Sequence, residues 1–66
     1  MYTHKSTEER VTRNAMRIWI DLPANRDPEK LAEIYRLTLA DMEETHTLLS
    51  RDDLVKIANE VLAEVA

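Results

Sequence analysis

The chain of 66 residues contains no glycine, no cysteine and no phenylalanine. Without cysteine it cannot form disulfides or thiolate metal sites, and we expect a protein of a reducing compartment, the cytoplasm. Without glycine it lacks the residue that phosphate-binding loops, β-bulges and primed hairpin turns usually need. Both absences favour a helical domain that uses no nucleotide, metal or other cofactor.

Long apolar runs are also missing. No segment approaches the ~18 consecutive apolar residues that a membrane span needs, and the first ten residues have no apolar stretch of the kind found in a signal peptide. We therefore expect a protein without a membrane segment. A chain of this length is one domain at most and buries only about 60% of the surface that its unfolded form exposes, so its core is small.

Charged residues, in contrast, are abundant and unevenly distributed. Residues 1–26 hold five basic and three acidic groups, a net charge of +2, whereas residues 27–66 hold four basic and ten acidic groups, a net charge of −6. The sum of −4 argues against a general affinity for nucleic acid. The uneven distribution is typical of two solvated faces, of a basic patch for an acidic partner, or of an acidic surface that imitates nucleic acid.

Three helix-start signals divide the chain. Ser6 opens a capping box, Asp27 is an N-cap followed by proline at the first helical position, and Ser50 is an N-cap with Asp53 three residues later. With residues 1–5 as a disordered tail, residues 6–66 form a single helical domain. The predicted fold is all-α, a small antiparallel three-helix bundle with helices over about 6–22, 28–45 and 51–65.

Apolar residues recur at helical spacing in all three segments, which predicts a core-facing stripe on each helix. In addition, Leu49 and Leu54 have the spacing of a hydrophobic staple around the third N-cap. The stripe of the first segment consists of Val11, Ala15, Ile18 and Leu22, that of the second of Leu31, Ile34, Tyr35, Thr38 and Met42, and that of the third of Leu54, Ile57, Ala58, Val61, Leu62 and Val65.

The first predicted helix carries a further apolar pair on its opposite side. Met16 and Ile20 are one turn apart and should contact each other on the surface, with Trp19 at the border of the core stripe and arginines beside them. Arginine and aromatic residues next to apolar ones are a composition that protein interfaces favour. The candidate partner-binding residues are Arg10, Arg13, Met16, Arg17, Trp19 and Ile20.

The sequence predicts a small non-catalytic regulator or inhibitor that binds a larger protein stoichiometrically. Both serines are explained as caps, His4 and His46 lack the helical spacing of a two-histidine metal site, and a small bundle offers few buried positions that could raise the pKa of a carboxyl group toward catalytic use. A homodimer through the same patch is compatible with this function. Small single-domain modulators are common in phages and mobile elements, although no residue here indicates a source.

Residues 15–22 also alternate with a period of two, which is a strand signal. A strand over 17–22 ending in Leu22-Pro23, followed by two helices, resembles a ribbon-helix-helix DNA-binding dimer, in which paired strands lie in the major groove. The resemblance implies DNA contacts from Arg17 and the basic N-terminal arm. It would also direct Asp21 toward phosphates, which is unfavourable. An extended backbone at Met16–Leu22 would distinguish this alternative from the three-helix bundle.

Overall fold

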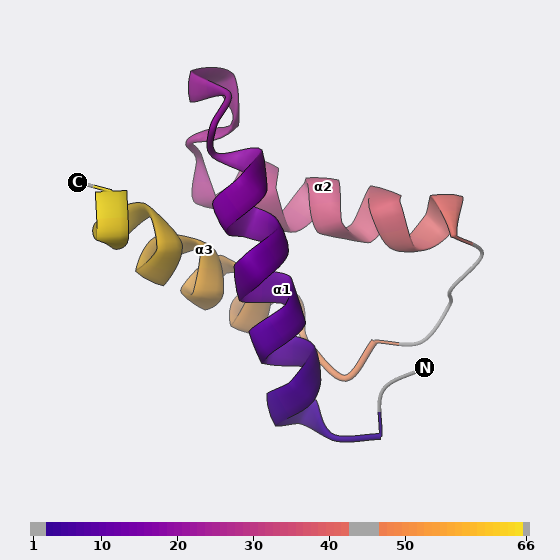
Figure 1. Ribbon diagram of the computed structural model, residues 1–66. Helices are drawn as coiled ribbons and strands as arrows, with labels where there is room; N and C mark the ends of the chain where they lie inside the picture. The colour runs from indigo at the N-terminus through magenta and orange to yellow at the C-terminus, as the bar shows by residue number, and fades with distance from the viewer. Residues whose placement is uncertain (1–2, 43–46, 66) are drawn as a thin grey trace.

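The computed structural model describes residues 3–42 and 47–65, and within these residues it contains three α-helices, one short 3₁₀ turn and no strand. Helices α2 and α3 run in opposite directions, and α1 crosses them (Figure 1). The predicted all-α, three-helix fold is therefore confirmed. The elements are α1 (Lys5–Trp19), η1 (Pro23–Asn25), α2 (Pro28–Asp41) and α3 (Arg51–Val65).

The strand proposed for residues 17–22 is wrong. α1 continues through Trp19, Ile20 follows as its C-cap in right-handed helical geometry, and the N–H of Ile20 donates to the carbonyl oxygen of Met16 at 3.0 Å. A strand that could pair with a second copy in a DNA groove is absent from the described part of the chain. The ribbon-helix-helix interpretation loses the element on which its DNA contacts depend.

The start of α1 differs from the predicted capping box. His4 is the N-cap, its backbone is extended, and its side chain makes no capping hydrogen bond. Ser6 lies inside the first turn, so the cap predicted at Ser6 is wrong. The acidic residue of the first turn, Glu8, is buried and accepts hydrogen bonds from other elements, as described below.

α1 ends three residues before the expected boundary. The proline at position 23 excludes a helical conformation for the residue before it, and the chain turns into η1 instead. Two side chains from the end of η1 and the residue after it bind carbonyl groups at the helix end: Asn25 Nδ2 donates to the oxygen of Trp19 at 3.0 Å, and Arg26 Nε donates to the oxygen of Ile20 at 2.9 Å.

The caps predicted for the other two helices are confirmed. The carboxylate of Asp27 accepts from the backbone N–H groups of Glu29 at 2.8 Å and Lys30 at 3.3 Å. At the start of α3 the bonds are reciprocal, since the N–H of Ser50 donates to Asp53 Oδ2 at 3.0 Å and the N–H of Asp53 donates to Ser50 Oγ at 3.2 Å. Each of these caps joins residues at most three positions apart.

α2 ends at Asp41, with Met42 as its C-cap. The end predicted near Thr45 lies outside the described residues. Met42 is exposed, so its predicted place in the core stripe of α2 is wrong. The last turn of α2 extends past α1 in Figure 1 and has no helix packed on that side in this view.

The core lies where the three helices meet. Leu49 and Leu54, the predicted staple, are both part of it. The stripe of α3 is confirmed except at its end, where Val65 is exposed. The buried apolar residues are Met16 and Ile20 from α1 and its C-cap, Leu31, Ala32 and Tyr35 from α2, Leu49 from the preceding link, and Leu54, Ile57, Ala58 and Val61 from α3.

The buried side of α1 is the reverse of the predicted one. Met16 is 0% exposed and Ile20 is 4% exposed, whereas Ile18 is 70% exposed and lies in the predicted core stripe. The buried row continues toward the N-terminus through Thr12 and Glu8, each one turn from the next. Because half of that row is polar, counting apolar residues selects the wrong side of the helix.

Candidate protein-binding surface

Two arginines that the sequence predicts for a partner surface bind α3 instead. Arg13 Nη2 contacts Glu60 Oε2 at 2.8 Å. Arg17 makes a bidentate pair with Glu64, with Nε to Oε1 at 2.9 Å and Nη2 to Oε2 at 2.8 Å. The hydrogen bond with Glu64 raises the pKa of Arg17, and the same bond lowers the pKa of Glu64.

A third pair extends this contact to the start of α3, where Lys5 Nζ lies 3.0 Å from Asp53 Oδ2. The backbone N–H of Ser50 and then Lys5 lower the pKa of Asp53. We call the three pairs the ion-pair seam (Lys5–Asp53, Arg13–Glu60 and Arg17–Glu64). Exposed pairs of this kind contribute little stability each. Their consequence is that much of the positive charge of α1 is neutralised by α3 and does not form an open basic patch.

A buried carboxylate joins α1 to α2 and to the segment before α3. Glu8 is 1% exposed. Its Oε2 accepts from Tyr35 Oη at 2.6 Å and from Thr47 Oγ1, and its Oε1 accepts from the N–H of Leu48 at 2.7 Å. Burial raises the pKa of Glu8, but the three hydrogen bonds lower it by more, and the pKa lies below its usual value. Glu8 is therefore held as a charged structural group.

Sequence reasoning missed this role of Glu8. The signal that could have found it is the i, i+4 spacing that links Glu8 and Thr12 to the apolar pair Met16 and Ile20. A row of four residues at that spacing lies on one side of a helix whatever the polarity of its members. Its polar half is then a candidate for buried hydrogen bonding rather than for a solvated face.

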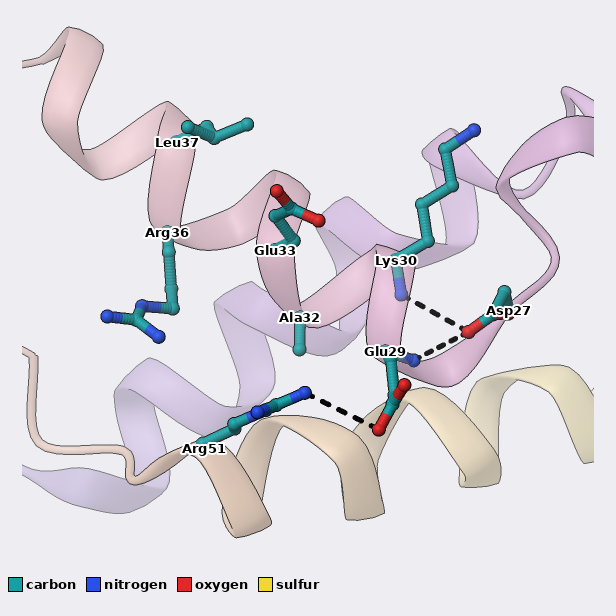
Figure 2. A pocket seen from close by; sticks show the side chains of 8 residues that line it. All are labelled: Asp27, Glu29, Lys30, Ala32, Glu33, Arg36, Leu37 and Arg51. Carbon is teal, nitrogen blue, oxygen red and sulfur yellow. Dashed lines mark hydrogen bonds and ion pairs between the residues drawn. The ribbon is translucent and has the colours of Figure 1, made fainter.

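An open hollow of about 680 Å³ lies between α2 and the start of α3 (Figure 2). Arg51 Nη2 lies 3.4 Å from Glu29 Oε1 across it, and the carboxylate of Asp27 at its edge is occupied by the helix cap. The residues that line it are Asp27, Glu29, Lys30, Ala32, Glu33, Arg36, Leu37 and Arg51. Three acidic and three basic side chains balance in charge, and the hollow has neither the enclosure nor the apolar lining of an ordinary ligand pocket.

The described residues hold neither a metal-binding cluster nor a membrane-spanning helix. Within 3–42 and 47–65, no group of three or more histidine, cysteine, aspartate or glutamate residues is placed to hold a metal ion. In the same part of the chain, no helix combines the length and the apolar character required to cross a bilayer.

The remaining feature is a row of apolar side chains along the exposed side of α1 and the turn that follows it. Val11 is 39% exposed, and Ile18 and Leu22 are 70% and 65% exposed. Ala15, between them, is half-buried. We call this set the outer row (Val11, Ala15, Ile18 and Leu22). The predicted core stripe of α1 is thus an exposed apolar strip.

Two further candidate residues border this surface. Arg10 is exposed and has no ion-pair partner among the residues that the structure describes. Trp19 is half-buried and packs against the core, so it is not a free anchor. With Met16 and Ile20 buried and Arg13 and Arg17 paired with α3, the six predicted residues do not form one surface. Their place is taken by the outer row.

No protein-family model, curated protein or solved structure matches this chain.

Proposed function

We propose that the protein is a small, non-catalytic, cytoplasmic regulator or inhibitor. It would bind a larger protein stoichiometrically through the outer row of α1. The observation that carries the proposal is the alignment of Val11, Ala15 and Ile18 at i, i+4 and i+7 on one side of α1, with Leu22 exposed in the turn that follows the helix. Helices that insert into a groove of another protein present anchors at this spacing. Scattered apolar residues on a surface are ordinary, but a continuous row is a feature of docking surfaces.

The outer row has enough apolar surface to act as an anchor. Ile18 and Leu22 are mostly exposed, and complete burial of a side chain of this size is worth about 1.5–3 kcal/mol. A few such residues commonly dominate the affinity of an interface. Arg10 directly precedes Val11 at the start of the row, so a groove with an apolar floor and a carboxylate near one end would complement α1.

A binding role also agrees with what the chemically capable groups are doing. Glu8 accepts three hydrogen bonds inside the fold. Asp27, Ser50 and Asp53 cap helices. These groups hold the protein together, and a surface that acts by covering a partner requires no reactive side chain.

The test is affinity capture from the native host cell with matched variants. Ile18→Glu places a charge in the centre of the outer row without disturbing the core, since Ile18 is exposed. Leu37→Glu makes the same change at an exposed leucine on α2. We expect one protein to be captured in about equimolar amount by the wild type and by Leu37→Glu, and lost with Ile18→Glu.

Circular dichroism of both variants provides the control, because both should keep the helical content of the wild type. Equal capture of the same protein by all three forms would exclude the outer row as the docking surface. Capture of no protein by the folded wild type would contradict the proposed function as a whole.

A further inference from the structure

Two exposed charges of opposite sign mark the two ends of the outer row. Arg10 lies near its start and Asp21 near its end, and neither has an ion-pair partner in the described ranges 3–42 and 47–65. They are eleven residues apart, about three helical turns. α1 ends at Trp19, but the N–H of Asp21 donates to the carbonyl oxygen of Ile18 at 3.2 Å, so the backbone keeps turning in the helical sense as far as Asp21. Arg26 is the next basic residue in the sequence after Asp21, and its Nε–H is used in a hydrogen bond to the carbonyl oxygen of Ile20.

We infer that a second copy of this chain covers the outer row in the free protein, with the two α1 helices antiparallel about a twofold axis near Ala15. This arrangement brings Arg10 of each copy toward Asp21 of the other. Side chains on a helix lean toward its N-terminus. In an antiparallel pair, Arg10 therefore extends toward the C-terminal end of the second α1, where Asp21 lies.

Two of the apolar residues, Val11 and Ile18, match under the same rotation. An axis between residues 14 and 15 sets Val11 against Ile18 of the second copy, and Ile18 against Val11. The small side chain of Ala15 lies at the centre, where it allows the helix axes to approach closely. A parallel pair would instead place Arg10 against Arg10 and Asp21 against Asp21. The charges thus select the antiparallel arrangement, in which every contact occurs twice.

The contact is small, and this determines how it should be measured. A standard stable interface buries about 800 Å² per partner, roughly a sixth of the 4582 Å² surface of this chain. One side of a 15-residue helix supplies less than that. We therefore expect a dimer that forms and dissociates with concentration. This inference rests on the proposed function, because it identifies what covers the outer row when no larger partner is present.

The experiment is sedimentation equilibrium of the purified full chain from about 10 μM to about 1 mM. Arg10→Glu and Asp21→Arg should each weaken the dimer about tenfold, because every pair is present twice and each single change replaces attraction by repulsion. The double variant, Arg10→Glu with Asp21→Arg, should recover the wild-type dissociation constant to within about threefold. A wild type that remains monomeric over the whole range overturns the inference. A dimer that the double variant fails to restore overturns it as well.

Cross-linking gives an independent readout of the axis, since the chain has no cysteine of its own. Ala15→Cys places a thiol beside the proposed twofold axis, and Ala40→Cys places one on the exposed side of α2. Ala15→Cys should oxidise to a disulfide-linked dimer much faster than Ala40→Cys, and equal rates would overturn the axis. Both measurements use purified protein and test only the dimer, so a negative result leaves the proposed function to be decided by the capture experiment. A negative capture experiment likewise leaves the dimer to be decided by these two measurements.

Discussion

Glu8 and Thr12 are two polar residues in the buried row of α1, and they differ in how their polar atoms are satisfied. Glu8 has hydrogen-bond donors from two other parts of the chain. The hydroxyl of Thr12 is fully buried and has no hydrogen-bond partner among the described residues. A buried hydroxyl without a partner costs free energy, because folding removes its hydrogen bonds to water without replacing them.

Thr12→Val should therefore stabilise the protein. The valine keeps the shape of the side chain and removes the unsatisfied oxygen, and we expect the free energy of unfolding to rise by about 1 kcal/mol. Urea unfolding followed by circular dichroism measures the change. The matched control is Thr38→Val on α2, where the hydroxyl donates to the carbonyl oxygen of Ile34 at 2.8 Å. An equal gain in both variants would show that the exchange of a hydroxyl for a methyl group, and not the missing hydrogen bond of Thr12, is responsible.

The three helices differ in how far their boundaries and buried sides follow from local sequence. The caps of α2 and α3 could be predicted because Asp27 and Ser50 bond to residues two or three positions away. The buried side of α1 could not, because Glu8 finds its partners 27 to 40 residues along the chain. The outward arginines were misassigned for the same reason, since Arg17 binds a glutamate 47 residues away.

Because the buried side of α1 is the reverse of the predicted one, substitutions at two isoleucines that are close in sequence should differ strongly in their effect on stability. Ile20→Glu would bury a charge among apolar residues, and we expect it to cost about 3 kcal/mol or more. Ile18→Glu changes an exposed residue and should alter stability by only about 0.5 kcal/mol. Thermal unfolding of the two variants beside the wild type compares them directly. Greater destabilisation by Ile18→Glu would restore the side of α1 that the apolar pattern predicts.

Over the whole molecule, acidic groups with a lowered pKa make stability depend on pH. Glu8, Asp53 and Glu64 each have a pKa below the ordinary value in the folded protein. The unfolded chain then binds more protons than the folded one as the solution becomes acidic. The stabilisation is complete above the ordinary values of 4.5 for Glu and 3.8 for Asp, and it is lost as the pH falls through the lower folded values.

We therefore expect the free energy of unfolding to decrease steadily on acidification below about pH 5. Glu8 should contribute most, because it is buried whereas Asp53 and Glu64 lie in the solvent-exposed seam. Chemical unfolding at a series of pH values should give a shallower acid slope for Glu8→Gln than for the wild type. Glu33→Gln, at an exposed carboxyl of α2, should keep the wild-type slope. An acid slope that is unchanged in Glu8→Gln would show that Glu8 is not the main source of the pH dependence of stability.

The distribution of partners along the chain also sets an order of events during synthesis. Apart from Tyr35, the side chains and amide that hold α1 through Glu8 and the seam arginines belong to residues 47–64. At about 5–20 residues per second, a ribosome needs a few seconds to reach them after α1 has been made. For that interval the contacts that hold α1 are missing, so the first of these three helices to be translated is fixed in place only after the third has been made.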